Sequence, residues 1–129
     1  MLPQRRVRMQ GVLLAATMCS EYGGSPMICL VLTGKTIEEN LEQFRRNRPY
    51  ISLLELRVDL LAPENREKAV DFPYQVDLPV ILTCRRKSDG GMYGESERHR
   101  FSLMEELAKG FFSYIDLEDD VKQIGRAHV

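Results

Sequence analysis

Residues 51–61 read ISLLELRVDLL, and this stretch indicates a β-strand whose two faces differ. Glu55, Arg57 and Asp59 share one face, because side chains alternate along a strand with a period of two residues. The residues between them are leucines and a valine, so the opposite face is apolar. A sheet rarely buries so many charges unless they pair with one another or bind something. The stretch therefore predicts a sheet with one apolar and one charged face.

Around this strand the chain alternates between strand and helix patterns. Apolar runs of strand length are found at 27–34, 78–85 and 111–118. Helical spacing of apolar residues predicts helices at 36–48, 63–72 and 95–109. Thr36, with Glu39 three residues later, predicts a capping box at the start of the first helix.

This β-α alternation predicts parallel strands joined by right-handed crossovers. It fits both a doubly wound sheet and a (β/α)8 barrel. Polar residues also mark the ends of two later strands, where Thr83 and Arg85 share a face, as do Asp116 and Glu118. Because barrels place polar chemistry at the carboxyl ends of their strands, we expect a polar pocket there. The alternative is an ion-pair network that binds no ligand.

Composition limits the class of protein. The 129 residues are enough for about one domain, and 43% apolar and 29% charged residues are ordinary for a globular protein. A formal net charge of −1 argues against a nucleic-acid partner, which usually requires a basic excess. No segment approaches the roughly 18 apolar residues of a membrane-spanning helix, so we expect no membrane partner.

The cysteines and histidines suggest no metal or redox chemistry. Cys19, Cys29 and Cys84 have no paired spacing, and we expect the last two to be buried free thiols in a reducing, cytoplasmic compartment. No His/Cys/carboxylate set has metal-ligand spacing, and His99 is expected to face solvent. The segment TGKT (33–36) is similar to the end of a phosphate-binding loop, but a cysteine replaces the required first glycine.

The two ends of the chain differ from the middle. Residues 1–26 have a basic start and a short apolar run, and we expect a leader or upstream-derived segment, with Met27 as the natural start. A short signal peptide is the alternative. Residues 124–129, IGRAHV, coincide with one reading frame of a sequencing-adapter oligonucleotide, and we expect them to be non-native.

Four segments in order carry a resemblance to a known family: LTGKT (32–36), ELRVDLL (55–61), PVILTCRRKSDGG (79–91) and YIDLE (114–118). They resemble the type I 3-dehydroquinate dehydratases, lyases of the shikimate pathway. Each segment alone is unremarkable, whereas all four in order, separated by helices of suitable length, are specific. The resemblance covers residues 27–123 and about the first half of the family's domain.

The resemblance implies a (β/α)8 TIM barrel, here only about its first four β/α units. It also implies that 3-dehydroquinate loses water through a Schiff base between a lysine and the substrate ketone, while a histidine moves protons. Glu55, Arg57 and Arg85 match substrate-contacting positions of the family. Asp89 stands where many members carry a glutamate that orients the catalytic histidine, and it is one methylene shorter. No cofactor is implied, the partner is a small-molecule substrate, and the full-length protein is expected to be a homodimer.

The chain also departs from the family pattern. Val31 stands where the family can offer a small hydroxyl side chain, and no lysine or histidine here matches the Schiff-base lysine or the catalytic histidine. We therefore expect a truncated fragment that is inactive alone. Two alternatives remain open: the dehydratase module of a protein fused to shikimate dehydrogenase, and a non-catalytic anion-binding α/β module.

Overall fold

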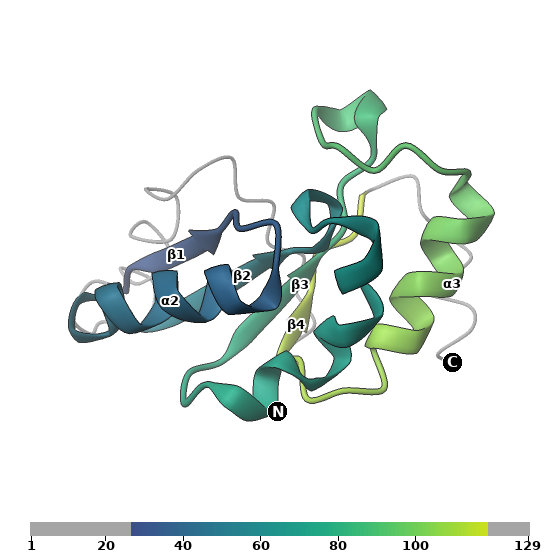
Figure 1. The fold of residues 1–129 in the computed structure, drawn as a ribbon. Coiled ribbons are helices and arrows are strands. Elements are labelled where there is room, and N and C mark those ends of the chain that lie inside the picture. The colour runs from purple at the N-terminus through teal and green to yellow at the C-terminus, as the bar shows by residue number, and fades with distance from the viewer. Residues whose placement is uncertain (1–26, 119–129) are drawn as a thin grey trace.

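The computed structural model describes residues 27–118, which form a parallel sheet covered by helices (Figure 1). The strands are β1 (Cys29–Leu32), β2 (Leu53–Arg57), β3 (Val80–Thr83) and β4 (Tyr114–Ile115). The α-helices are α2 (Ile37–Asn47) and α3 (Glu97–Leu107). Three expectations lie outside the described residues: the leader at 1–26, the tail at 124–129 and the state of Cys19.

The order of the strands separates the two expected sheet types. The strands lie in the order β1-β2-β3-β4, and each pairs in parallel with the next. The spatial order of the strands is therefore their order in the sequence. A doubly wound sheet reverses direction at a switch point, whereas a (β/α)8 barrel adds its strands in sequence. The sheet within 27–118 has no such reversal and is built as a barrel is.

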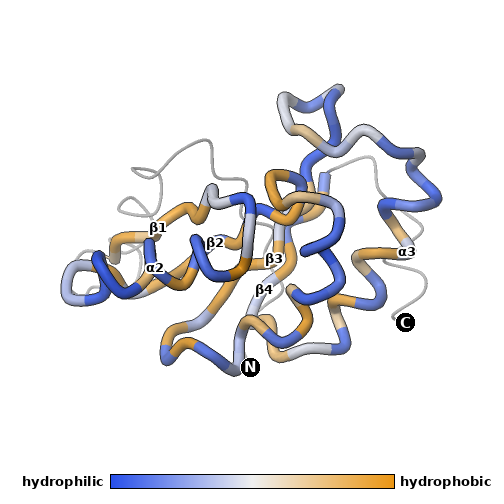
Figure 2. Tube along the Cα trace, in the orientation of Figure 1, coloured by the Kyte–Doolittle hydropathy of each residue, from blue (hydrophilic) through white to orange (hydrophobic). Residues whose placement is uncertain are grey.

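The two faces of the sheet carry different residues, as the alternation in 51–61 predicts. Leu54, Leu56 and Leu82 join the main core with apolar residues of both α-helices. Cys29, Leu53 and Ile81 form a separate small apolar cluster that includes no helix residue. Apolar colour follows the strands and the inner sides of the helices, and polar colour gathers on outer surfaces and loops (Figure 2). Within residues 27–118, the helices therefore pack against one face of the sheet.

Both α-helices begin where a hydroxyl side chain caps the first turn. Thr36 Oγ1 accepts the Glu39 N–H at 3.1 Å, and α2 ends just before Pro49, since proline cannot supply the next helical N–H. The predicted capping box differs in one bond, because the carboxylate of Glu39 accepts the N–H of Lys35 at 3.5 Å. Ser96 caps α3 in the same way as Thr36 caps α2.

Three predictions about elements were wrong. The helix expected at 63–72 is two 3-10 segments, Pro63–Asn65 and Glu67–Gln75, and the second contains Pro73, which has no N–H for a regular α-helix. The strand expected at 51–61 ends at Arg57. Asp59 instead lies in the 3-10 turn Val58–Leu60.

The fourth strand is the third correction. It has only two residues, so Asp116 and Glu118 lie beyond it, and strand alternation does not apply to them. Their carboxylates bind different arginines, Asp116 binding Arg85 and Glu118 binding Arg100.

The thiol prediction is confirmed for the two described cysteines. Cys29 and Cys84 are buried and free, and burial raises the pKa of each thiol to about 12. Neither is a reactive thiolate at neutral pH, because burial in apolar surroundings disfavours the charged form. Among the helices of residues 27–118, none is long and apolar enough to cross a membrane.

Candidate functional site

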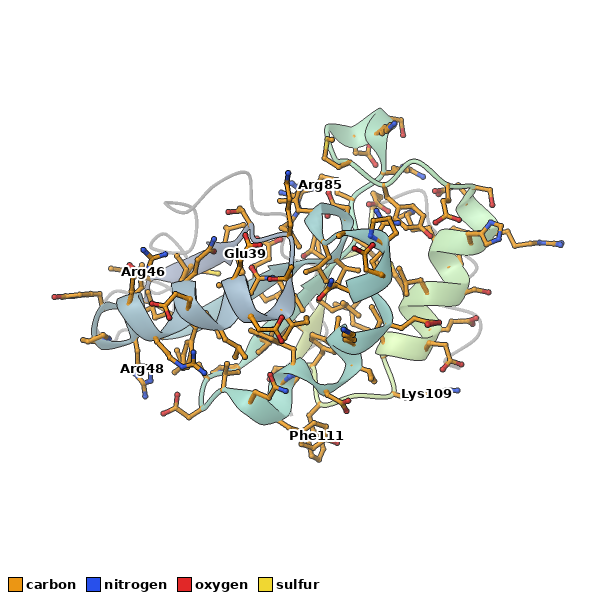
Figure 3. All side chains as sticks on the ribbon, viewed as in Figure 1. Glu39, Arg46, Arg48, Arg85, Lys109 and Phe111 are labelled. Carbon is orange, nitrogen blue, oxygen red and sulfur yellow. The ribbon has the colours of Figure 1, made fainter. Side chains whose placement is uncertain are left out.

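Glu55 and Arg85 meet at the carboxyl ends of two neighbouring strands. The carboxylate of Glu55 accepts a hydrogen bond of 2.6 Å from Thr83 Oγ1, and Arg85 Nη2 approaches the same oxygen at 3.9 Å. Arg85 Nη2 also lies 3.4 Å from Asp116 Oδ2. All four residues are buried. Figure 3 shows Arg85 at the end of the molecule opposite Phe111.

Sheet register explains why these side chains come together. Glu55 pairs with Ile81, and Arg57 pairs with Thr83, so their side chains stand on the same face of adjacent strands. The small cluster of Cys29, Leu53 and Ile81 lies on this same face, with Ile81 directly beside Glu55. The polar side chains of Glu55, Thr83 and Arg85 are therefore bordered on one side by apolar residues, which exclude water there.

The environment of Glu55 shifts its ionisation. Burial raises the pKa of this carboxyl above its ordinary value, while the Thr83 hydrogen bond and the charge of Arg85 act in the opposite direction and only partly offset it. Burial dominates because the side chain is 1% exposed. Glu55 therefore takes up a proton more readily than a carboxylate in water.

Arg57 is held by Asp59. The two side chains form a fork, with Arg57 Nε and Nη2 donating at 2.9 and 2.7 Å, and the Asp59 side chain is fully buried. Burial opposes the charge of Arg57, but the Asp59 hydrogen bond and charge outweigh it and raise the pKa of the guanidinium. Asp59 Oδ2 also accepts a hydrogen bond of 3.0 Å from the N–H of Met92, which holds the loop after β3.

The loop after β3 folds back over the end of that strand. The N–H of Tyr93 donates to the carbonyl of Arg85 at 3.1 Å, and Gly91 donates to the carbonyl of Arg86 at 2.9 Å. A Cβ added at Gly91 would stand 2.2 Å from the Arg85 carbonyl oxygen, so only glycine fits here. Gly90 adopts a φ of 85°, the left-handed region that also favours glycine.

The three cations of the run Arg85-Arg86-Lys87 lie in different surroundings. Arg85 points along the charged face, whereas Arg86 binds Asp89 at 2.6 Å and Glu97 of α3 at 2.8 Å. Lys87 is exposed. Asp89 is therefore placed at the loop, about a quarter exposed, with its carboxylate oriented by Arg86.

Sequence reasoning missed two residues of this region. Asp59 was counted as a charge of the strand, but it is the partner that orients Arg57. Arg100, the residue after His99, was not among the predicted site residues. His99 is exposed as predicted, but Arg100 is 0% exposed. The sequence does contain a signal for this burial. Arg100 precedes Met104 and Leu107 by four and seven residues, the spacing of residues on the buried face of a helix.

Taken together, the features define a parallel β/α protein with charged side chains at the carboxyl ends of its strands. Comparison with known proteins then gives the family. The type I 3-dehydroquinase family model matches residues 28–128, and the chain belongs to this family.

Curated relatives agree with that assignment. The chain is 33% identical over 101 residues to a 3-dehydroquinate dehydratase of Dehalococcoides mccartyi, a match that covers 78% of this chain and 42% of the relative. It is 29% identical to that of Coxiella burnetii, over 73% of this chain and 40% of the relative. For Methanococcus maripaludis the identity is 27%, over 71% and 41%. The chain thus spans about two fifths of the length of these relatives.

Proposed function

We propose that this chain supplies the substrate-binding wall of a 3-dehydroquinate dehydratase, a hydro-lyase that converts 3-dehydroquinate to 3-dehydroshikimate and water. The observation that carries the proposal is the buried contact of Glu55, Thr83 and Arg85 across adjacent strands. A second guanidinium, Arg57, stands next to Glu55 on the same face. Relatives that bear this name share the family of the chain.

The chemistry of the wall suits a small hydroxylated carboxylate. A guanidinium holds carboxylate or hydroxyl oxygens with parallel N–H donors, and Arg57 and Arg85 present two such groups. Glu55 can accept hydrogen bonds from substrate hydroxyls while balancing the charge of Arg85. Partial burial strengthens these contacts, because competition from water is reduced.

The proton-transfer part of the proposal concerns Asp89. Its carboxylate, held by Arg86, is available to orient the ring of a histidine and to stabilise that ring when it carries a proton. The Schiff-base lysine is a separate question. Lys35, Lys68, Lys87 and Lys109 are all exposed, and none of these four is desolvated as a reactive amine requires. We propose that the lysine and the histidine belong to the part of the relatives that this chain does not match, on the remaining strands of a closed barrel.

Binding of 3-dehydroquinate to the 129-residue chain tests the wall directly. Titration followed by ¹H–¹⁵N NMR should shift the amides of Glu55, Thr83 and Arg85, and Arg85→Gln should abolish the shifts. Arg45→Gln is the matched control, since Arg45 is exposed on α2 and pairs only weakly with Glu42 at 4.0 Å. Retention of the same affinity in Arg85→Gln would contradict the proposed wall.

A non-catalytic anion-binding module is the second candidate, and the exposure of the four described lysines favours it. Borohydride reduction in the presence of 3-dehydroquinate separates the candidates when it is applied to this chain joined to the unmatched part of the Dehalococcoides mccartyi relative. Trapping of a substrate adduct supports the dehydratase, and binding without trapping supports the module. A fused shikimate dehydrogenase would add nicotinamide-dependent activity to the same gene product.

A further inference from the structure

Arg100 is the largest fully buried side chain in the described part of the chain, and its guanidinium is saturated with hydrogen bonds. An arginine has five N–H groups. Five hydrogen bonds are present: Nε and Nη2 bind Glu97 at 2.8 and 2.9 Å, Nη1 and Nη2 bind Glu118 at 3.3 and 2.9 Å, and Nη1 binds the Cys84 carbonyl at 2.8 Å. A buried arginine with every donor used is a fixed element of structure, because any movement breaks several charged hydrogen bonds at once.

One of these bonds acts on the main chain beside Arg85. The Cys84 carbonyl belongs to the peptide group that joins Cys84 to Arg85, just past the end of β3. The next carbonyl, that of Arg85, accepts the N–H of Tyr93. The backbone of Arg85 is thus held on one side by Arg100 and on the other by its own loop.

A second path leads from Arg100 to Asp89. Glu97 receives two hydrogen bonds from Arg100 and one of 2.8 Å from Arg86, and Arg86 in turn binds Asp89 at 2.6 Å. The hydrogen bonds from Arg100 and Arg86 lower the pKa of the Glu97 carboxyl to about 2, so it stays ionised throughout the ordinary pH range. Positive and negative charges thus alternate along the path from Arg100 through Glu97 and Arg86 to Asp89. Each carboxylate on this path is oriented by a neighbouring arginine.

A third path reaches the segment after β4. Glu118 binds Arg100, and Asp116, two residues earlier, binds Arg85. The same buried guanidinium therefore joins the start of α3, the end of β3 and the segment that carries the Asp116 partner of Arg85.

We infer that Arg100 is a positioning residue, which sets the place of Arg85 and Asp89 from behind the wall without touching the substrate. The inference rests on the proposed function of that wall. Lysine cannot replace Arg100 in this role, because an ammonium has three donors and no planar fork with which to bind Glu97 and Glu118 together.

Hydrogen exchange of the ¹⁵N-labelled 129-residue chain tests the positioning directly. In Arg100→Lys, the amides of Tyr93 and Gly91, which bond back to the end of β3, should exchange at least about tenfold faster, the ratio expected for about 1.4 kcal/mol less local protection. The amides of Ser52 and Leu54, bonded to Ile28 and Pro79 across the sheet, should change less than about twofold. Equal acceleration at all four amides, or none at any, would overturn the inference.

Two companion variants make the result specific. Glu97→Gln removes the charge that links Arg100 to Arg86 but leaves the buried arginine, and it should loosen the same two loop amides even if Arg100→Lys fails to fold. Arg98→Lys is the matched control, since Arg98 is exposed on the same helix and should leave every amide unchanged. Faster loop exchange in Arg98→Lys would show a general effect of α3 and overturn the inference.

Titration with 3-dehydroquinate separates failure of the positioning from failure of the proposed function. If the unaltered chain binds, Arg100→Lys and Glu97→Gln should weaken binding at least about fivefold, a loss of about 1 kcal/mol. Unchanged affinity with a loosened loop would overturn the positioning of Arg85. If the unaltered chain does not bind, the proposed wall fails, while the exchange rates still decide whether Arg100 holds the loop.

Discussion

Replacement of Thr83 by valine isolates the hydrogen bond that holds Glu55. Valine has nearly the shape of threonine, so the change leaves no cavity and removes only the hydroxyl that donates to Glu55 at 2.6 Å. Both side chains are 1% exposed, and water cannot replace the lost donor without opening the site. A hydrogen bond to a charged group contributes about 1.5–3 kcal/mol, and we expect Thr83→Val to lower the free energy of unfolding by about 2 kcal/mol at pH 7.

The dependence of this loss on pH distinguishes the bond from simple packing. The Thr83 hydroxyl lowers the pKa of Glu55, and its removal lets burial raise that pKa further. Thr83→Val therefore has its full effect on the free energy of unfolding at pH values above the pKa of Glu55 in the variant, where Glu55 is ionised in both proteins. The charge-dependent part of this effect disappears as the pH falls below the pKa of Glu55 in the unaltered chain, where Glu55 is protonated in both proteins. The loss that remains is that of a neutral hydrogen bond, about 1 kcal/mol.

Urea unfolding followed by circular dichroism, repeated across this pH range, measures both effects. Thr33→Val is the matched control, since Thr33 is exposed at the end of β1 and the same atoms change without loss of a buried donor. We expect the control to stay within about 0.5 kcal/mol of the unaltered chain. A loss in Thr83→Val that is equally small, or that does not vary with pH, would refute this account of Glu55.

Three further predictions concern the loop, the core and the acid limit. Gly91→Ala should destabilise the chain more than Gly90→Ala, because only a Cβ at position 91 meets the Arg85 carbonyl. Gly90→Ala should cost about 1 kcal/mol, the penalty for a side chain at a left-handed φ. Thermal unfolding of both variants measures the difference. Leu56→Ala should cost about 2–5 kcal/mol in urea unfolding, as Leu56 is fully buried against the helices. Glu97→Gln should be less stable than the unaltered chain above the ordinary pKa of 4.5. The gap should close as the pH falls toward about 2, where Glu97 itself becomes protonated, and a gap that persists in acid would exclude the carboxylate as its cause.

Much of the fold follows from periodicity within short segments. Strands β1 and β3 and the two α-helices were predicted within about two residues, because apolar spacing of two or about 3.6 residues is a local property. Strands β2 and β4 are present but shorter than predicted. The helix expected at 63–72 was wrong for a local reason too, since Pro73, inside Glu67–Gln75, has no N–H for an α-helical hydrogen bond. The alternation of strands and helices left two sheet types open, and the pairing of each strand with the next has the strand order of a barrel.

The candidate site divides in the same way. Glu55, Arg57 and Arg85 could be predicted as the charges of one face, because alternation places them there and the four family-like segments mark the same positions. Their partners could not be predicted with equal success. Arg57 binds Asp59 across a turn where a strand was predicted, and Asp89 binds Arg86, a pairing that no local pattern indicated.

By itself, the sequence determined the order of strands and helices, the apolar face of the sheet and the positions of Glu55, Arg57 and Arg85 on the charged face. Only the tertiary structure decided which cation binds which carboxylate, and that Arg100 is buried. Thr83 lies 28 residues from Glu55, Arg85 lies 31 from Asp116, and Arg100 lies 18 from Glu118. Contacts at such separations depend on strand register and on the rotation of α3 against the sheet. Both are set by packing of the whole core and not by any local pattern.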